Sequence, residues 1–309
     1  MFIKIIKLRH SLFLRFALMI LLLASMGACG KSKEEARLEL ARLNVAFNEE
    51  SFVQSAKIGD TLAVKLFLAA GMDPDVQDKL GNTPLIVAAH AGHAETVRLL
   101  LAHNADLEAR DNLLKAPPLI WAAMGGDPET IKILLARGAD HAVRDKRGVT
   151  ALLAAAGAGR NTVVDFLVSQ GADLNSRDNN GHTALMWAAA QGHSKTIRLL
   201  LSLGSELEDR DKRGSTALHL AAESGRTDAV KVLLESGADI RARDNDGRTA
   251  LMYAAADDHR DTVRFLLAKG ADADARDKEG NTALDLAKSD EDVMEMLFEA
   301  EGRGSMRKK

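Results

Sequence analysis

Hydrophobic and polar positions recur along this chain with a step of about 33 residues, and residues 178–210 carry the pattern in full. The unit opens with the polar run Asn179-Asn180-Gly181, whose residues tolerate the positive φ angles of a tight turn. Thr183 follows at a place where its hydroxyl can accept a hydrogen bond from a free N–H group of a helix. The pattern therefore predicts a turn and then a short first helix over residues 184–191.

A second helix is predicted directly downstream of the first. Its apolar Ile197, Leu200 and Leu201 recur at helical spacing, and Gly204 ends it, which places the helix at about residues 194–203. Helices as short as these two are marginal in water on their own. Each unit must therefore bury its apolar face against a neighbouring unit, which is the organisation of a solenoid.

The consensus of the units, D-x-x-G-x-T-A-L-x-x-A-A-x-x-G-H followed by L-L and G-A-D, resembles the ankyrin repeat. The resemblance implies an all-α fold, an ankyrin-repeat solenoid of stacked helix-turn-helix units. It also implies that β-hairpin loops project to one side of the stack. These loops and the first helices would together form a concave face that binds another protein.

One elongated repeat domain is expected at residues 44–300. It consists of a degenerate N-terminal cap repeat, six full repeats and a polar C-terminal cap repeat, at residues 44–77, 78–276 and 277–300. Residues 301–309 lack an apolar period and are expected to form a disordered tail.

The first 28 residues have the features of a targeting signal, in which basic residues precede a short apolar run and small residues follow. The apolar run is too short for an ordinary membrane span. The sequence Ser25-Met26-Gly27-Ala28-Cys29 resembles a bacterial lipobox. That resemblance implies a signal peptide at residues 1–28, cleavage before Cys29 and a lipid anchor on its thiol. A plain secretory signal followed by an incidental cysteine and an uncleaved signal-anchor are the alternatives.

Lipidation of Cys29 implies a place in the bacterial cell envelope. Because Gly30 rather than an aspartate follows Cys29, the sorting rule of such lipoproteins implies the outer membrane, with the repeats facing the periplasm. Loss of residues 1–28 removes four cations and no acids, so the formal net charge changes from −3 to −7. No strong basic field then remains for nucleic acid, and the expected contacts are with another protein and, through the lipid, with a membrane.

Residues 29–43 are expected to hold the lipidated Cys29 and a charged helical spacer. Ala36, Leu40 and Leu43 would lie on one side of that helix. The favoured interpretation is a helix that packs on the first repeat and shields it, and the alternative is a coiled coil that binds a partner.

Residues that recur at one place in every unit are expected to serve the fold. Glycines end the second helices, and Asn104 replaces the glycine in the first full unit because Asn also tolerates the left-handed conformation. An arginine precedes the aspartate that opens each following unit, and we expect these arginines to pair with acidic residues of neighbouring loops. His93, His193 and His259 share the position after the inter-helix break, and no partner at metal-binding spacing accompanies them.

Positions that differ between units are the candidates for recognition. Loop tips with Lys or Arg alternate with tips that carry Asn, and Trp121, Trp187 and Tyr253 occupy equivalent first-helix positions in every second unit. Packing in the core is the favoured role of these rings, but aromatics flanked by basic tips are also good anchors for an acidic or amphipathic protein segment. The candidate partner-binding residues are Leu113, Leu114, Trp121, Lys146, Arg147, Asn179, Asn180, His182, Met186, Trp187, Lys212, Arg213, His219, Arg248, Met252 and Tyr253.

The unit that starts at Asp111 departs most from the consensus. Its loop has one additional residue, lacks the turn glycine and carries Pro117 in place of the capping threonine, although Pro118 can still begin the helix. We expect this loop to expose Leu113 and Leu114, and exposed apolar residues often mark contacts. Sequence drift is the alternative explanation.

No catalytic constellation is present in the sequence. His182 and His219 have no Ser or Cys nucleophile in a recognisable setting, and no phosphate-binding or dinucleotide glycine motif occurs. We therefore expect no enzyme activity, no cofactor and no metal. The favoured function is a lipid-anchored, non-catalytic protein-protein interaction module, and the alternative is a protective or inhibitory subunit of a specific enzyme or toxin.

Overall fold

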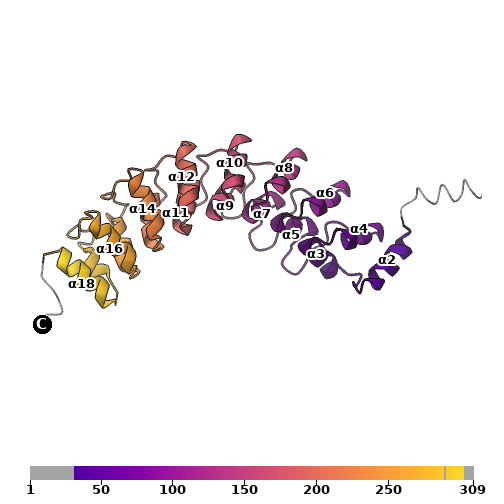
Figure 1. Cartoon of the computed structure of the whole chain (residues 1–309), viewed down its shortest axis with the longest axis horizontal. Coiled ribbons are helices and arrows are strands. Elements are labelled where there is room, and N and C mark those ends of the chain that lie inside the picture. Colours follow the sequence, from indigo (N-terminus) through magenta and orange to yellow (C-terminus); the bar gives the residue numbers. More distant parts are fainter. Residues whose placement is uncertain (1–30, 289, 303–309) are drawn as a thin grey trace, which may run out of the picture.

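The computed structural model of the chain describes residues 31–288 and 290–302, and within these residues all regular structure is helical (Figure 1). The predicted signal peptide at residues 1–28, Cys29 and residues 303–309 lie outside the described residues. The helices are α2 Lys33–Arg42, α3 Glu49–Ile58, α4 Thr61–Ala69, α5 Pro84–Ala91, α6 Ala94–Ala102, α7 Pro118–Gly125, α8 Pro128–Ala136, α9 Ala151–Gly157, α10 Asn161–Ser169, α11 Ala184–Gln191, α12 Ser194–Ser202, α13 Ala217–Glu223, α14 Thr227–Glu235, α15 Ala250–Ala256, α16 Arg260–Ala268, α17 Ala283–Leu286 and α18 Glu291–Ala300.

The helices form two stacked rows, as the solenoid prediction requires. The first helices of successive units contact one another from α3 to α17 in odd-numbered order, and the second helices do so from α4 to α18 in even-numbered order. Figure 1 shows the units along a curved ribbon in which the first helices lie on the inner side of the arc and the second helices on the outer side. One continuous apolar core runs through the stack, from Ala36 to Leu297.

The predicted helix pair of the unit at 178–210 is confirmed. The Thr183 hydroxyl accepts a hydrogen bond from the Met186 N–H at 3.4 Å, and α11 starts at the next residue, Ala184. The second helix, α12, ends at Ser202, one residue before the predicted end, and Gly204 follows with φ of 99°. Asn104 has φ of 61°, so it takes the left-handed conformation that glycine provides in the other units.

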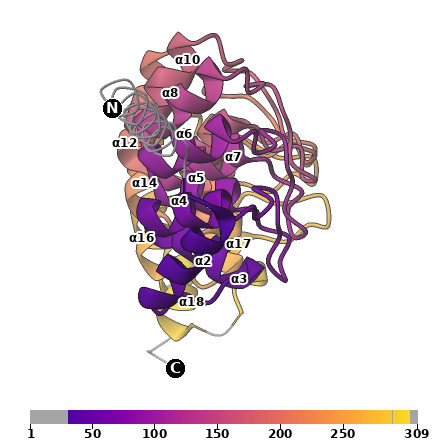
Figure 2. The ribbon, with the colours of Figure 1, turned by 90° about the vertical axis from the view of Figure 1, so that its right-hand side faces the viewer.

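The loops differ from the β-hairpins that the family resemblance implies. Between α10 and α11, for example, the chain makes short turns at residues 174–175 and 179–180, and no strand occurs in residues 31–288 or 290–302. Neighbouring tips are joined by single backbone hydrogen bonds, such as the one from the Asn179 N–H to the Arg147 carbonyl at 2.8 Å. All loops nevertheless project to the same side of the helices, as Figure 2 shows.

The N-terminal end of the stack is covered by α2, which packs on α4. Ala36 and Leu40 are fully buried there, which agrees with the interpretation of this segment as a shielding helix. Leu43 is 45% exposed, so its expected place on the packed side is wrong, because the chain leaves the helix at that residue. In the described part of the chain, no helix is both long and apolar enough to cross a lipid bilayer.

The recurring arginines have a structural role, but not the one expected. Arg177 donates from its guanidinium to the Gly181 carbonyl at 3.1 Å and to the Arg210 carbonyl of the next unit at 2.9 Å. Equivalent pairs of bonds recur at Arg110, Arg144, Arg210 and Arg243. The arginines therefore join the loops mainly through backbone carbonyls rather than through acidic side chains, although Arg177 also pairs with Asp209.

Candidate functional site

The turn of each unit is organised by its opening aspartate. The Asp178 Oδ1 atom accepts hydrogen bonds from the N–H groups of Asn180 at 2.8 Å and His182 at 2.9 Å. Asp145 makes the same two bonds in the preceding unit, with Arg147 and Val149. The carboxylate thus fixes the backbone of the tip, and the tip side chains are presented from a rigid support.

The second oxygen of the aspartate is bound by the aromatic residue in every second unit. The Trp121 indole donates to Asp111 Oδ2 at 3.0 Å, and the Trp187 indole donates to Asp178 Oδ2 at 3.2 Å. The Tyr253 hydroxyl donates to Asp244 Oδ2 at 2.6 Å. These bonds give the three rings a structural role, in agreement with the interpretation that favoured packing.

In two of the alternating units an arginine from the loop tip lies beside that oxygen, within hydrogen-bond range at Asp145 but not at Asp211. Arg147 Nε and Nη2 both lie 3.0 Å from Asp145 Oδ2, and Arg213 Nε lies 3.7 Å from Asp211 Oδ2. The same guanidinium groups lie over the aromatic ring of the following unit. Arg147 Cζ is 5.7 Å from the centre of the Trp187 ring, and Arg213 Cζ is 5.8 Å from the centre of the Tyr253 ring.

The alternation of basic tips and aromatics in the sequence therefore corresponds to a network of aspartates, guanidinium groups and rings that runs from Asp145 to Asp244, and Asp111 and Trp121 form an equivalent pair before it. Burial, together with the hydrogen bond to Asp244, raises the pKa of the Tyr253 hydroxyl to about 12. Burial also acts to raise the pKa of Asp111, but hydrogen bonds from backbone N–H groups and from the Trp121 indole outweigh it and lower the pKa below the ordinary value. Both shifts have the same two causes, burial and hydrogen bonds within the network.

The predicted recognition residues fall into three groups by exposure. Exposed side chains, which a partner can reach, belong to Leu113, Lys146, Asn179, Asn180, Lys212 and Arg213. Half-buried side chains belong to Leu114, Trp121, Arg147, His182, Trp187 and Arg248. Buried side chains belong to Met186, His219, Met252 and Tyr253.

Three candidates are corrected by this burial. Met186 and Met252 are each 1% exposed and pack in the core, because the first helices are covered by a neighbouring helix on both sides. His219 is equally buried, and its Nε2 lies 3.1 Å from the carbonyl oxygens of both Ala242 and Arg248 in the next unit. Burial lowers the pKa of His219, so the ring is held neutral. These three residues are structural and cannot contact a partner of the folded protein.

His182 and Arg248 connect consecutive units. His182 Nδ1 lies 3.2 Å from Asp178 Oδ2, and its Nε2 lies 3.3 Å from Asp211 Oδ2. Arg248 occupies the same position two units further along, and its Nε lies 3.6 Å from Asp277 Oδ2. Both side chains lie against buried aspartates, so only their exposed edges are available to a partner.

The irregular loop at residues 111–118 exposes one of its two leucines. Leu113 is 61% exposed, as predicted. Leu114 packs against the core, so its expected exposure is only partial. The loop keeps the shared architecture because Asp111 still accepts the backbone N–H groups of both leucines, and α7 begins at Pro118 without a side-chain cap.

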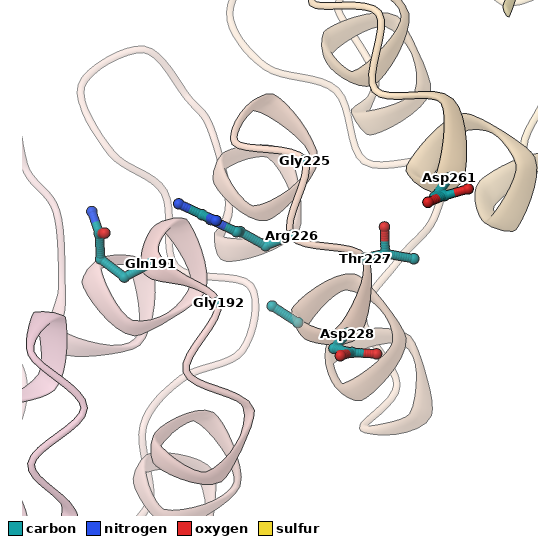
Figure 3. Close-up of a pocket in the computed structure, with 8 residues that line it drawn as sticks. Gln191, Gly192, Gly225, Arg226, Thr227, Asp228 and Asp261 are labelled. Atoms are coloured by element: carbon teal, nitrogen blue, oxygen red, sulfur yellow. The ribbon is translucent and has the colours of Figure 1, made fainter.

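A hollow of about 540 Å³ lies at the inter-helix breaks, lined by Gln191, Gly192, Gly225, Arg226, Thr227, Asp228, Ala229 and Asp261 (Figure 3). In Figure 3 the Arg226 side chain extends toward Gly192 and Gln191. Its Nε donates to the Ala190 carbonyl at 3.3 Å. His193 occupies the same position and lies 3.1 Å from the Gly157 carbonyl. These residues join adjacent units.

His93 and His259 make the same contact with the preceding unit, through the carbonyls of Lys57 and Glu223. Residues 31–288 and 290–302 contain no cluster of three or more His, Cys, Asp or Glu side chains arranged to hold a metal ion.

Three residues of the network were not among the sequence candidates: His90, Gly157 and Glu223. They occupy one shared position near the end of the first helix. His90 and Gly157 lie beside the aromatic ring of the next unit, and Glu223 pairs with Arg213, which lies over that ring. Alignment of the units shows that this position holds a ring, a hydrogen atom and a carboxylate in every second unit, with Met124, Ala190 and Ala256 in the units between. That variation was available in the sequence, but the contact across units was not.

Comparison with known proteins agrees with this architecture. A family model described as ankyrin repeats (3 copies) matches residues 52–145, 119–211, 152–244, 203–277 and 237–305. The matches together run without a gap from residue 52 to residue 305, so the chain belongs to the ankyrin-repeat family.

A segment of 61 residues is 39% identical to the interferon antagonist OPG039 of monkeypox virus. That segment covers 20% of this chain and 22% of the viral protein, so the similarity spans less than a quarter of either protein.

Proposed function

We propose that this protein is a non-catalytic interaction module that binds a partner protein on the surface formed by its loop tips and first helices. The observation that carries the proposal is the arrangement of the tips. Lys146, Asn180 and Lys212 are exposed, while their backbones are fixed by buried aspartates and by hydrogen bonds to neighbouring tips. Side chains that vary between units and are presented from a rigid support are suited to recognition, because little conformational entropy is lost on binding.

Anchorage in the bacterial cell envelope is the second part of the proposal. The lipobox-like sequence ends at Cys29, and α2 begins at Lys33 with a capping box formed by Ser32 and Glu35. The folded stack therefore starts within four residues of the proposed lipid, which would hold its N-terminal end close to the membrane. The residue after the cysteine is Gly30, which favours the outer membrane and a periplasmic location of the repeats.

Crosslinking in intact envelopes, followed by mass spectrometry of the proteins that copurify, tests the interaction. The test variant carries Lys146→Glu and Lys212→Glu at two exposed tips. The matched control carries Lys132→Glu and Lys231→Glu, which make the same charge change at exposed positions of the second helices α8 and α14. We expect a specific partner to be lost only with the tip variant, and equal recovery with both variants would exclude the tip surface.

Anchorage is tested separately by growth with labelled palmitate. The label should enter the wild-type protein and be absent from Cys29→Ala, and incorporation that survives the substitution would contradict a lipid on Cys29.

The alternative function, a subunit that blocks a specific enzyme or toxin, is decided by the partner that is recovered. It requires a tight one-to-one complex and loss of the partner's activity on mixing. A partner that keeps its activity in the complex supports an adaptor instead.

A further inference from the structure

The binding surface contains three compartments built from equivalent positions of alternate units, and the residues at these positions differ between them. Each consists of a tip residue, a residue in the last turn of the same unit's first helix, and the aromatic ring of the next unit. The compartments are Leu80, His90 and Trp121; Arg147, Gly157 and Trp187; and Arg213, Glu223 and Tyr253. We call them the first, middle and third compartments.

The third compartment is closed by its own carboxylate. Glu223 Oε1 and Oε2 accept from Arg213 Nη1 at 3.2 Å and Nη2 at 2.9 Å, so the outer edge of this guanidinium is already paired. Glu223 accordingly raises the pKa of Arg213. A carboxylate of another protein would have to displace Glu223 to bind there.

The middle compartment has the same arginine and no such carboxylate. Gly157 stands where Glu223 does, and a Cβ atom at Gly157 would lie 3.0 Å from Trp187 Cε3. The absence of a side chain thus lets the indole pack closely and leaves the outer edge of Arg147 open. Arg147 is held at its inner edge by Asp145 and is 42% exposed, and its Nη1 has no hydrogen-bond partner among the described residues.

The first compartment is apolar where the other two are basic. Leu80 is 62% exposed, and the His90 ring packs edge-to-face on Trp121 with 5.2 Å between the ring centres. The middle compartment is therefore the one of the three that has an oriented guanidinium whose outer edge is not paired with a carboxylate of this chain's described residues. It also carries one negative charge fewer than the third compartment, because Gly157 replaces Glu223.

We propose that Arg147, oriented by Asp145 and stacked on Trp187, anchors a carboxylate side chain of the partner protein. This inference deepens the proposed function and rests on it. A guanidinium that is already oriented loses little freedom on binding and offers two parallel donors to a carboxylate, as Glu223 shows at the equivalent arginine. The expected occupant is an extended protein segment with an Asp or Glu that enters the middle compartment.

The test uses the purified protein and a library of random peptides displayed on phage. We expect the enriched peptides to share an acidic position, and replacing that Glu by Gln in a synthetic peptide should weaken binding about tenfold or more. Because this change lies in the peptide, it leaves the folding of the protein untouched. Enriched peptides without an acidic position would overturn the role of Arg147 while the proposed protein-binding function stands, whereas failure to enrich any peptide would count against both.

Protein variants then assign the contact to one arginine. Arg147→Gln should lower the affinity for the acidic peptide as much as the Glu-to-Gln change in the peptide does. The two changes together should lower the affinity no more than either change alone. The matched control Arg198→Gln, at an exposed arginine on the second helix α12 that is paired with Glu235, should leave the affinity unchanged. Glu223→Gln should leave the outer edge of Arg213 without a carboxylate, and the library screened on this variant should yield peptides with a second acidic position. Independent, additive losses for Arg147→Gln and the peptide change would overturn the proposed contact.

Discussion

Ionisation of Tyr253 reports directly on the aspartate and aromatic network. Tyr253 is the only tyrosine in the chain, so the near-ultraviolet absorbance of phenolate follows this one group. It is 9% exposed and donates to Asp244 at 2.6 Å. Burial, followed by that hydrogen bond, raises its pKa to about 12, compared with an ordinary value of 10.0. The difference corresponds to about 2–3 kcal/mol that favours the neutral hydroxyl in the folded protein.

The sign of the pH dependence follows from this shift. The contribution of Tyr253 to stability is fully present below the pKa of the unfolded chain, near 10.0. It is lost as the pH rises from there toward 12, because the unfolded chain releases a proton that the folded protein keeps. The free energy of unfolding should therefore fall across this alkaline window, and Tyr253→Phe should remove that part of the slope.

The assay is a spectrophotometric titration, with circular dichroism to confirm that the protein stays folded at each pH. The native midpoint should lie near 12 and the urea-unfolded midpoint near 10. Asp244→Asn should lower the native midpoint without returning it to the unfolded value, because burial is the largest cause of the shift. A native midpoint equal to the unfolded one would show that the hydroxyl is hydrated and would refute the network at this position.

Three further predictions concern stability, measured as the free energy of unfolding in urea. The pKa of His219 is lowered in the folded protein, so its contribution to stability is complete above the ordinary pKa of 6.5 and is lost as the pH falls below that value. In His219→Gln the free energy of unfolding should therefore fall less steeply with decreasing pH. Trp187→Ala should destabilise the protein by about 2–3 kcal/mol, since it removes a half-buried ring and leaves Asp178 without its indole donor. A decrease in the free energy of unfolding of less than about 0.5 kcal/mol, which is typical of substitutions at the surface, would contradict that structural role. Arg177→Ala removes hydrogen bonds to two carbonyls and the ion pair with Asp209, and should lower the free energy of unfolding by about 1–2 kcal/mol. An unchanged free energy of unfolding would show that water replaces these bonds fully.

Much of the fold could be predicted because its signals are local. Thr183 caps the helix that follows it, and glycines or Asn104 end the helices before them, so each signal lies within a few residues of its effect. The absence of strands was not predicted, because the turn sequences are compatible both with β-hairpins and with the short turns observed. Neighbouring tips are joined by single backbone hydrogen bonds, which do not form a strand ladder.

The candidate site was predicted less completely because its contacts cross units. The alternation of basic tips and aromatics was visible in the sequence, but the position of Arg147 over Trp187 joins residues in different repeats and depends on the stacking geometry. Burial of Met186 and His219 was missed for a related reason. A helix in the middle of a stack is covered by neighbouring helices on two sides. More of its surface is therefore buried than the single apolar face of an amphipathic helix would indicate.

The central claim, that a partner protein binds the loop tips and first helices, is tested most directly by site-specific photocrosslinking in cells. A photoreactive residue is placed at Asn180, an exposed tip beside the middle compartment, and in a second strain at Lys231, an exposed position on the second helix α14. The account predicts a discrete crosslinked partner from Asn180 and none from Lys231. Crosslinks to the same partner from Lys231, with none from Asn180, would contradict the account.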